Sequence, residues 1–492
     1  MLSAAAAVGV GHGVAALVNP SASPLLAVGS ALIDAAPTPA KEFAVRTFGT
    51  ADKPILISAI SVVLLIFAGI LGLIAWRRRI VALVGISLLG LVGMIIAVSR
   101  GTAVDAVPSV VAGLVGIGVL WLLTRDRRPG RAADNRSSLS RRRLLLGLGA
   151  TGVLAAVGGF GGEMVTRTKQ AASAARRAIG LPAPASVAKT IPAGAQLPDM
   201  TPFRTSIDKF YRVDISLVTP SVDTTGWNLT IDGMVDRPLT LTYDDLIALP
   251  MIERDVTLTC VSNEVGGSYV GTARWLGVPF SEIIKRVGVR PGVDQVYAYS
   301  SDSGYTCSTP YQAVSDGRDA MIVVGMNGQV LPEKNGFPAR MLVPGLFGFV
   351  SATKWLERIE FTTYAERTAY WTERKWATDS PILTQSRIDV PKSLGTVSKD
   401  KPVIAGVAWA QHRGIQKVEI RIDGGEWHEV KLAEDAGVDL WRQWSYRYDG
   451  ASGRHSAQVR ATDLTGETQP EERTKVFPSG ARGWHEIQFT AE

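Results

Sequence analysis

The stretch Asp255-Val-Thr-Leu-Thr-Cys-Val-Ser-Asn-Glu-Val-Gly-Gly267 carries the clearest structural signal in this chain. Its β-branched run, Val256–Thr259, predicts a buried strand that ends at Cys260. Two small polar residues, Ser262 and Asn263, come next, and the glycine pair that follows is typical of a turn. A cysteine at the end of a strand beside such a turn faces outward, so its thiolate is well placed to bind a ligand. The alternative is a structural cysteine or one half of a disulfide.

Three further stretches carry a family resemblance. They are Phe210-Tyr-Arg-Val-Asp214, Gly304-Tyr-Thr-Cys-Ser-Thr-Pro310, and Met326-Asn-Gly-Gln-Val-Leu-Pro-Glu-Lys-Asn-Gly-Phe-Pro-Ala-Arg-Met-Leu-Val-Pro-Gly345 followed by Lys354-Trp355-Leu356. Together with the Cys260 stretch, and in this order, they resemble the sulfite oxidase family of molybdopterin enzymes. The resemblance covers about residues 200–480, and the glycine-phenylalanine-proline-x-arginine segment is its most specific part.

Composition divides the chain into a membrane part and a globular part. Its 492 residues predict two or three domains, and a mean hydropathy of +0.14 is high for a chain with 20% charged residues. The apolar excess lies before about residue 160. Much of the net charge of +7 falls on Arg77-Arg78-Arg79 and on the stretch Arg125–Arg143, beside apolar runs. These charges therefore indicate membrane flanks, and no nucleic-acid partner is expected.

Residues 1–162 are predicted to be a transmembrane helical region with about five spans. The apolar runs are Ala4–Ile33, Ile55–Ala75, Ile80–Val98, Ala106–Leu123 and Leu144–Phe160. The first contains Asn19-Pro20 and Pro24, so it is either one long tilted span or a span with a re-entrant piece. The arginine positions predict an amino terminus inside the cell and everything after Gly162 outside. We therefore expect a multi-pass protein of the cell membrane with an extracytoplasmic catalytic domain.

An internal arginine motif suggests how that domain crosses the membrane. Ser140-Arg141-Arg142-Arg143-Leu144-Leu145 resembles a twin-arginine export signal, although the arginines also fit an ordinary anchor on the cytoplasmic side. A domain that takes up its cofactor in the cytoplasm must fold before it is exported, which favours the export reading.

The remaining residues predict a linker and two folded domains. Residues 163–202, rich in Ala, Pro, Thr and Lys, are typical of a linker. Residues 203–370 mix strand and helix patterns, including a helix over Leu276–Val287, and predict an α+β domain; the resemblance makes it the molybdopterin-binding oxidoreductase domain. Residues 371–492 contain short strands separated by turns and predict an all-β, immunoglobulin-like sandwich. The family often dimerises through such a domain, so a homodimer is one expectation.

The resemblance gives roles to individual residues. It makes Cys260 the molybdenum ligand, and a soft thiolate suits a metal already held by the sulfurs of a pterin. Asn263 then lies beside the cofactor, Arg212 binds an anionic substrate, and Tyr305 points at the metal centre. Each role has an alternative. Cys260 could instead form a disulfide with Cys307, and Asn263 could be a turn residue. Arg212 could be a solvated strand residue, and Tyr305 could be a core tyrosine.

Three cations are candidates for holding the pterin and its phosphate. They are Arg274, Arg340 and Lys354, because a buried phosphate needs cations or backbone donors. The resemblance thus predicts a molybdenum-molybdopterin cofactor bound by Cys260, Asn263, Arg274, Arg340 and Lys354, with Cys260, Tyr305 and Arg212 as the catalytic residues.

Two departures from the family pattern concern the substrate. Sulfite-oxidising members carry an arginine directly after the asparagine and a histidine two places after the first arginine. Here these positions are Glu264 and Asp214. Each swap puts an acid near the expected substrate pocket, which weakens the expectation of sulfite as the natural substrate but not of cofactor binding.

The sequence thus predicts a membrane-anchored, extracytoplasmic molybdopterin oxidoreductase, sulfite oxidase-like in type. It would transfer an oxygen atom to or from a small oxyanion or an S- or N-oxide, and exchange electrons with a separate carrier. The alternative from another class is a non-catalytic, membrane-tethered scaffold or adhesion protein that has a Cys260–Cys307 disulfide and no cofactor.

Overall fold

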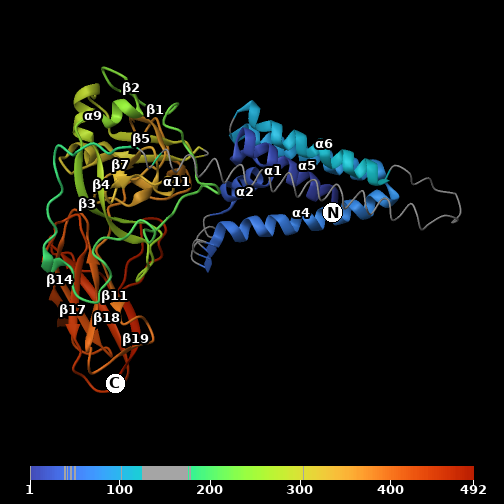
Figure 1. The fold of residues 1–492 in the computed structure, drawn as a ribbon. Coiled ribbons are helices and arrows are strands. Elements are labelled where there is room, and N and C mark those ends of the chain that lie inside the picture. The colour runs from blue at the N-terminus through green and yellow to red at the C-terminus, as the bar shows by residue number, and fades with distance from the viewer. Residues whose placement is uncertain are drawn as a thin grey trace. The chain divides into compact units, whose positions relative to one another are not determined.

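The chain divides into two compact units in the computed structural model. The described residues are 2–37, 51–100, 102–124, 179–302 and 304–492, with residue 176 and a few positions between 40 and 48. One unit is Met1–Ala175 with Ile215–Thr219, and the other is Arg176–Asp214 with Pro220–Glu492. The first is helical and the second is built mainly of strands (Figure 1). The four domain boundaries given above stay predictions.

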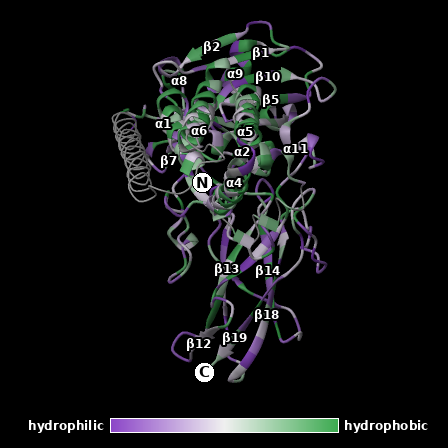
Figure 2. Ribbon diagram, turned by 90° about the vertical axis from the view of Figure 1, so that its right-hand side faces the viewer, coloured by the Kyte–Doolittle hydropathy of each residue, from purple (hydrophilic) through white to green (hydrophobic). Residues whose placement is uncertain are grey.

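The described part of the first unit contains five α-helices, and three of them are long and apolar enough to cross a membrane. These three cover Asp52–Ala75, Arg79–Ser99 and Ala103–Leu122, and they coincide with three predicted spans. The helices are coloured largely as hydrophobic in Figure 2. The predicted span Leu144–Phe160 and the Arg141-Arg142 motif lie outside the described residues. The helices are α1 (Leu2–Val18), α2 (Pro24–Ala35), α4 (Asp52–Arg77), α5 (Arg79–Arg100) and α6 (Val107–Thr124), with short 3-10 turns at Pro20–Ala22 and Ala103–Ala106.

The apolar run Ala4–Ile33 forms two helices rather than one. Proline lacks a backbone N–H, and α1 ends where Asn19-Pro20 begins the turn that leads to Pro24 at the start of α2. The Asn19 side chain accepts a hydrogen bond from the Ser21 N–H and donates one to Asp105 (2.9 Å) before α6. The break is therefore built from specific polar contacts.

Two sheets form the part of the second unit that precedes residue 371. One has the order β2-β1-β10-β5-β6, and the other has the order β3-β4-β7-β8 with β9 also paired to β7. Strands β3 and β4 are antiparallel, with Ile252 opposite Gly277 and Thr259 opposite Val270, so Cys260 follows directly at the end of the ladder. The strands are β1 (Asn228–Gly233), β2 (Leu239–Thr242), β3 (Ile252–Thr259), β4 (Val270–Pro279), β5 (Gln295–Ser300), β6 (Thr306–Pro310), β7 (Met321–Met326), β8 (Gln329–Val330), β9 (Arg340–Leu342) and β10 (Leu356–Thr362), and the helices are α8 (Tyr243–Ile247), α9 (Phe280–Val287), α10 (Tyr311–Ser315) and α11 (Tyr370–Glu373).

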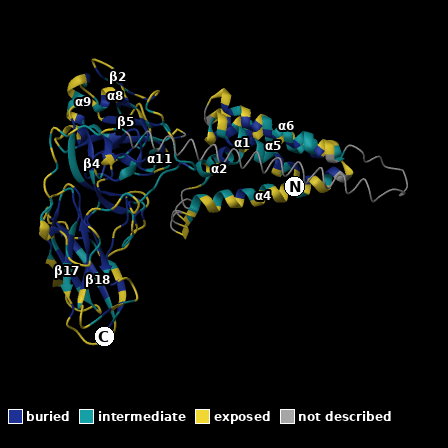
Figure 3. Ribbon diagram, viewed as in Figure 1, coloured by how far each residue is buried: buried dark blue, intermediate teal, exposed yellow. Residues whose placement is uncertain are grey.

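The residues after β10 and α11 form two further sheets that share a buried core. Their orders are β11-β13-β17-β16 and β12-β19-β18-β14-β15. Ile404, Trp444, Val459 and Phe489 are among the side chains packed between them. Figure 3 shows β4 largely buried, whereas the surface of α4 is mostly intermediate or exposed. The strands are β11 (Gln385–Val390), β12 (Gly395–Val397), β13 (Val403–Trp409), β14 (Ile415–Ile422), β15 (His428–Glu429), β16 (Lys431–Leu432), β17 (Arg442–Arg447), β18 (Gly453–Asp463) and β19 (His485–Ala491).

The predicted helix over Leu276–Val287 is wrong in its first turn. Leu276–Pro279 ends strand β4, where it pairs with β7, and the helix begins only at Phe280. The apolar periodicity cannot distinguish these two states, because the register with β7 decides between them.

We predict that Asp463 is a main support of the fold after residue 371. Its buried carboxylate accepts hydrogen bonds from Arg413 (2.8 Å), Thr384 (2.7 Å) and Thr465 (2.6 Å). Burial alone would raise its pKa, but these donors hold the pKa down at about 2. Asp463→Asn should lower the free energy of unfolding by about 2 kcal/mol at neutral pH. Thermal unfolding followed by tryptophan fluorescence measures this.

The pH dependence of that loss follows from the sign of the shift. Because the folded pKa lies below the unfolded value of 3.8, the stabilisation is complete above about pH 4 and disappears as the pH falls toward 2. The exposed Asp449 is the matched control, and Asp449→Asn should change stability by less than about 0.5 kcal/mol. Equal effects of the two variants would contradict the assignment.

Candidate cofactor and active site

Cys260 is buried where strand β3 ends and a tight turn begins. Its backbone N–H extends the β3–β4 ladder by donating to Tyr269 O (2.9 Å), and its carbonyl accepts from the Asn263 N–H (3.0 Å). The side chain is 9% exposed. Burial raises the pKa of the thiol, while hydrogen bonds from Ser262 and the charge of Lys354 oppose that rise. A thiolate at this position therefore needs a nearby cation to stabilise it.

Cys307 occupies a different environment and is not bonded to Cys260. Both cysteines are free thiols. Cys307 lies on β6, where its Sγ donates to Phe349 O (3.2 Å), and burial raises its pKa to about 11. The disulfide that the scaffold alternative requires is therefore not formed.

Two of the predicted site cations are joined by one carboxylate. Asp214 Oδ2 accepts hydrogen bonds from Arg212 Nε (2.7 Å) and from Lys354 Nζ (2.9 Å). The carboxylate is only 5% exposed, and the Lys354 side chain is 13% exposed. Burial lowers the pKa of Lys354, and the charge of Asp214 opposes this. Asp214 thus acts as the internal counter-ion of the cluster.

Arg340 is a buried cation for which no carboxylate is present among its described partners. Its Nη1 donates to Asn335 O (3.1 Å), and its guanidinium lies over the ring of Trp275, 5.2 Å from the centroid. Burial lowers its pKa to about 10. An isolated buried charge is costly, so this position favours a bound anion such as a phosphate.

Several buried polar atoms around these cations have no hydrogen-bond partner in the described part of the chain. They are Asn263 Nδ2, Asn335 Oδ1 and Arg340 Nε. Buried polar atoms are normally paired, so a group of unpaired ones indicates a missing ligand with donors and acceptors of its own. Gly336 allows Lys354 and Arg340 to pack closely at the same place, because a Cβ there would lie only 3.0 Å from Lys354 Cβ and 3.1 Å from Arg340 Cβ. These residues fit a polar, phosphate-bearing cofactor.

Tyr305 brings a protonated phenol to this region. Its hydroxyl lies 3.5 Å from Phe349 O, and its ring packs against Tyr370 with 5.7 Å between centroids. Burial, together with the neighbouring thiols of Cys307 and Cys260, raises the pKa of Tyr305 well above its ordinary value. The phenol therefore keeps its proton and can donate a hydrogen bond.

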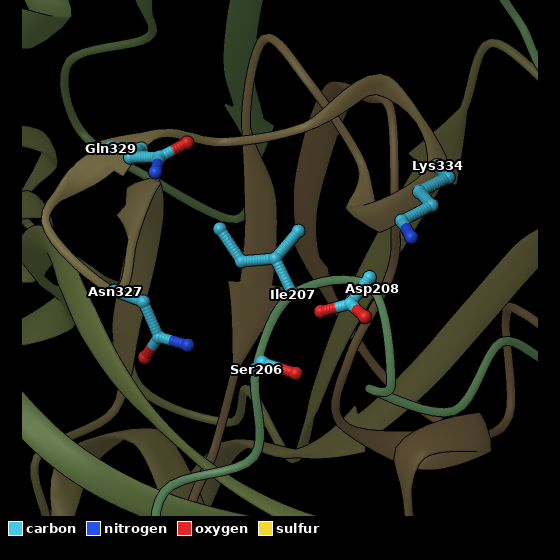
Figure 4. A pocket seen from close by; sticks show the side chains of 6 residues that line it. All are labelled: Ser206, Ile207, Asp208, Asn327, Gln329 and Lys334. Carbon is cyan, nitrogen blue, oxygen red and sulfur yellow. The ribbon is translucent and has the colours of Figure 1, made fainter.

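Arg274 is not brought to this cluster. Its guanidinium pairs with Asp255 (2.7 Å) and Glu253 (3.4 Å) across the β3–β4 ladder. Val270 is opposite Thr259, the residue before Cys260, and Arg274 lies four residues further along β4. The backbone of Arg274 is therefore about 13 Å along the strand from that end of the ladder. A hollow of about 460 Å³ lies at the Arg274 end, where Asn327 Oδ1 accepts from the Arg274 N–H (Figure 4). Ser206, Ile207, Asp208, Asn327, Gln329 and Lys334 line it.

Comparison with known proteins assigns the domain that carries this cluster. Residues 216–371 match the family model described as the oxidoreductase molybdopterin binding domain. These residues form an oxidoreductase molybdopterin-binding domain. A NADH nitrate reductase of Solanum lycopersicum is 28% identical over 51% of this chain and 34% of its own length, and the mitochondrial sulfite oxidase of Rattus norvegicus is 26% identical over 55% of this chain and 59% of its own length.

A solved structure shares the fold. The sulfane dehydrogenase SoxCD of Paracoccus pantotrophus superimposes with a TM-score of 0.50 and 23% identity over 59% of this chain and 82% of that one. The chain spans about one third to three fifths of the length of the two curated relatives. A molybdenum-dependent oxidoreductase domain with a molybdopterin cofactor is the common element.

Sequence reasoning missed Asn335 as a residue of the cluster. It lies in the quoted segment Met326–Gly345, directly before Gly336. Its side chain is buried, and its Oδ1 is unpaired in the described part of the chain, which only the folded chain reveals.

We predict that Asp214 holds the cation cluster together. In Asp214→Ala the buried Lys354 loses its counter-ion, so the free energy of unfolding should fall by about 3 kcal/mol. The matched control is Asp232→Ala, which breaks the more exposed pair with Arg358 and should cost less than about 1 kcal/mol. Thermal unfolding of the full chain in detergent measures both. A smaller loss for Asp214→Ala than for Asp232→Ala would contradict the prediction.

Proposed function

We propose that this chain is a membrane-anchored, extracytoplasmic molybdopterin oxidoreductase. It transfers an oxygen atom to or from a small oxyanion or an S- or N-oxide, and exchanges electrons with a separate carrier. A nitrate reductase and a sulfite oxidase are among its relatives, so both directions of oxygen transfer on a small oxyanion are represented there.

The observation that carries this proposal is the buried free thiol of Cys260 next to buried cations and unpaired polar atoms. A packed structural site would satisfy these groups internally, as happens at Asp463. A cofactor that carries a metal, sulfur ligands and a phosphate would satisfy all of them at once.

Each residue then has a distinct role. Cys260 would be the thiolate ligand of molybdenum, while Asn263, Arg340 and Lys354 would bind the pterin and its phosphate. When bound, the cofactor would supply a two-electron centre for oxygen-atom transfer.

The substrate side would be formed by Arg212 and Tyr305. Arg212 would orient the substrate oxygen, and the protonated Tyr305 phenol would donate a hydrogen bond to it. Arg274 stays a prediction as a cofactor ligand, and its pairs with Asp255 and Glu253 favour a structural role instead.

The other parts of the chain would serve anchoring and assembly. The three apolar helices support membrane anchoring, and the arginine-rich flanks support an extracytoplasmic position for the residues after Gly162. We propose that the two sheets after residue 371 form an immunoglobulin-like domain through which the protein dimerises. Export through the twin-arginine pathway is part of the same proposal.

We predict that Cys260→Ser purifies as a folded protein without turnover and without the visible absorption of a thiolate–metal bond, because a hydroxyl is a poor ligand for a soft metal site. Cys307→Ser is the matched control, since Cys307 is also buried and free, and it should keep both. Turnover, visible spectra and unfolding temperatures of the two variants measure this. Normal turnover in Cys260→Ser, or loss of turnover only in Cys307→Ser, would overturn the assignment.

We predict that uncharged oxides are better substrates than sulfite. The Asp214 carboxylate already accepts hydrogen bonds from Arg212 and Lys354, so an oxyanion must compete with it for these two cations. The kcat/KM for a neutral S- or N-oxide should exceed that for sulfite by about tenfold or more, which corresponds to one charge interaction in a partly buried site. A panel with a viologen donor and a ferricyanide acceptor measures both directions.

Paired variants sharpen the same test. Asp214→Asn should lower the KM for sulfite, whereas Glu264→Gln should have little effect because Glu264 is exposed. A wild-type preference for sulfite, unchanged in Asp214→Asn, would contradict the proposed role of Asp214.

A further inference from the structure

The loop that follows Cys260 is only partly stabilised by its own hydrogen bonds. Asn263 Oδ1 accepts from the Tyr269 N–H (2.7 Å), and the Gly267 N–H donates to Glu264 O (2.8 Å). Asn263 also has the unpaired Nδ2 described above. The position of the thiol therefore depends on what else contacts this loop.

Arg387 contacts the loop from strand β11. Its Nη1 donates to Gly267 O (2.7 Å), while its Nε and Nη2 bind the two oxygens of Asp389 (2.7 and 3.1 Å). Asp389 is buried and also accepts from Thr201 Oγ1 (2.7 Å). A guanidinium fixed by a bidentate pair has little freedom, so its third nitrogen is aimed at the loop.

His485 supports the same loop from strand β19. Its Nδ1 accepts from the Ile388 N–H (3.0 Å), and its ring lies where a Cβ of Gly266 would be, 2.2 Å from Cδ2. Burial and the charges of Arg387 and Arg473 lower the pKa of His485 to about 4, so the ring is neutral at neutral pH. Gly266 also has a φ of +77°, so glycine meets two requirements here.

The strand that leads to Cys260 is held by the same part of the chain. β3 is the edge strand of its sheet, so one side of it has no strand neighbour. On that side the Thr257 N–H donates to Asp439 O (3.0 Å), and the Trp441 N–H donates to Thr257 Oγ1 (2.9 Å). Gln411 Nε2 donates to Thr259 Oγ1 (3.0 Å). Residues after 371 thus contact both the strand and the loop that flank Cys260.

We infer that the two-sheet domain after residue 371 is part of the Cys260 site, and that Arg387 is a positioning residue that fixes the Cys260 loop through the Gly267 carbonyl. The inference rests on the proposed function, because the position of the thiol matters most if it binds a metal. It gives this domain a role at the site in addition to assembly.

The test compares Arg387→Met with Arg442→Met in the full-length protein. Arg442 is the matched control, because it also donates from a partly buried guanidinium to backbone carbonyls, those of Ala433 and Ile415, but within its own domain. In metal-free protein, Arg387→Met should speed alkylation of Cys260 by iodoacetamide about tenfold, since loss of a charged hydrogen bond favours local opening by about that factor. Arg442→Met should leave the rate unchanged. Peptide mass spectrometry distinguishes Cys260 from Cys307.

The metal-loaded protein provides a second readout. Arg387→Met should shift the visible absorption of the thiolate–metal bond and lower kcat about tenfold with little change in KM, as outer supports of a metal ligand do. Arg387→Lys, which keeps a donor and a charge, should partly restore both.

The outcomes separate the inference from the proposed function. An unchanged alkylation rate in Arg387→Met overturns the inference, whatever the metal content. Turnover retained in Cys260→Ser overturns the proposed function, while the alkylation rates still decide whether the loop is braced. If Arg387→Met does not fold, Arg387→Lys serves instead: it loses the bidentate pair with Asp389, so it should still speed alkylation, by less than tenfold. An alkylation rate in Arg387→Lys equal to that of the wild type would also overturn the inference.

Discussion

The site depends on a charge imbalance inside the protein. Arg340 and Lys354 are both buried, and Asp214 is the only carboxylate that the described contacts place against Lys354 and Arg212. Because desolvation disfavours these cations, the folded chain carries a cost that an anionic ligand would offset. The unpaired Asn335 Oδ1 and Arg340 Nε add a demand for hydrogen bonds at the same place. Stability and ligand binding are therefore linked here.

The same lack of solvation also affects the Cys260 thiol. Burial raises the pKa of Cys260, and Lys354 offsets only part of that rise, so the thiolate becomes favourable when a metal supplies the missing positive charge. The same burial keeps Tyr305 protonated. One poorly solvated region thus raises the pKa of both the Cys260 thiol and the Tyr305 phenol.

Local features of this architecture could be predicted from the sequence, and those set by distant residues could not. The strand that ends before Cys260 follows from a short-range pattern, and it is confirmed. Arg274 was expected to bind the cofactor, but cross-strand register places it opposite Asp255. The start of helix α9 was predicted four residues too early, because pairing with β7 extends β4 to Pro279.

The edge position of β3 explains why residues after 371 reach the Cys260 loop. A strand with one free side needs cover, and here Thr257 receives it from Asp439 and Trp441, far along the chain. Cys260 lies three residues after Thr257, directly after the end of β3, so whatever orders this edge also orders the thiol. The strand edge and the Gly267 carbonyl are covered only once the residues after 371 have packed against them. The order of the thiol therefore depends on contacts between segments that lie 120 and 184 residues apart in the sequence.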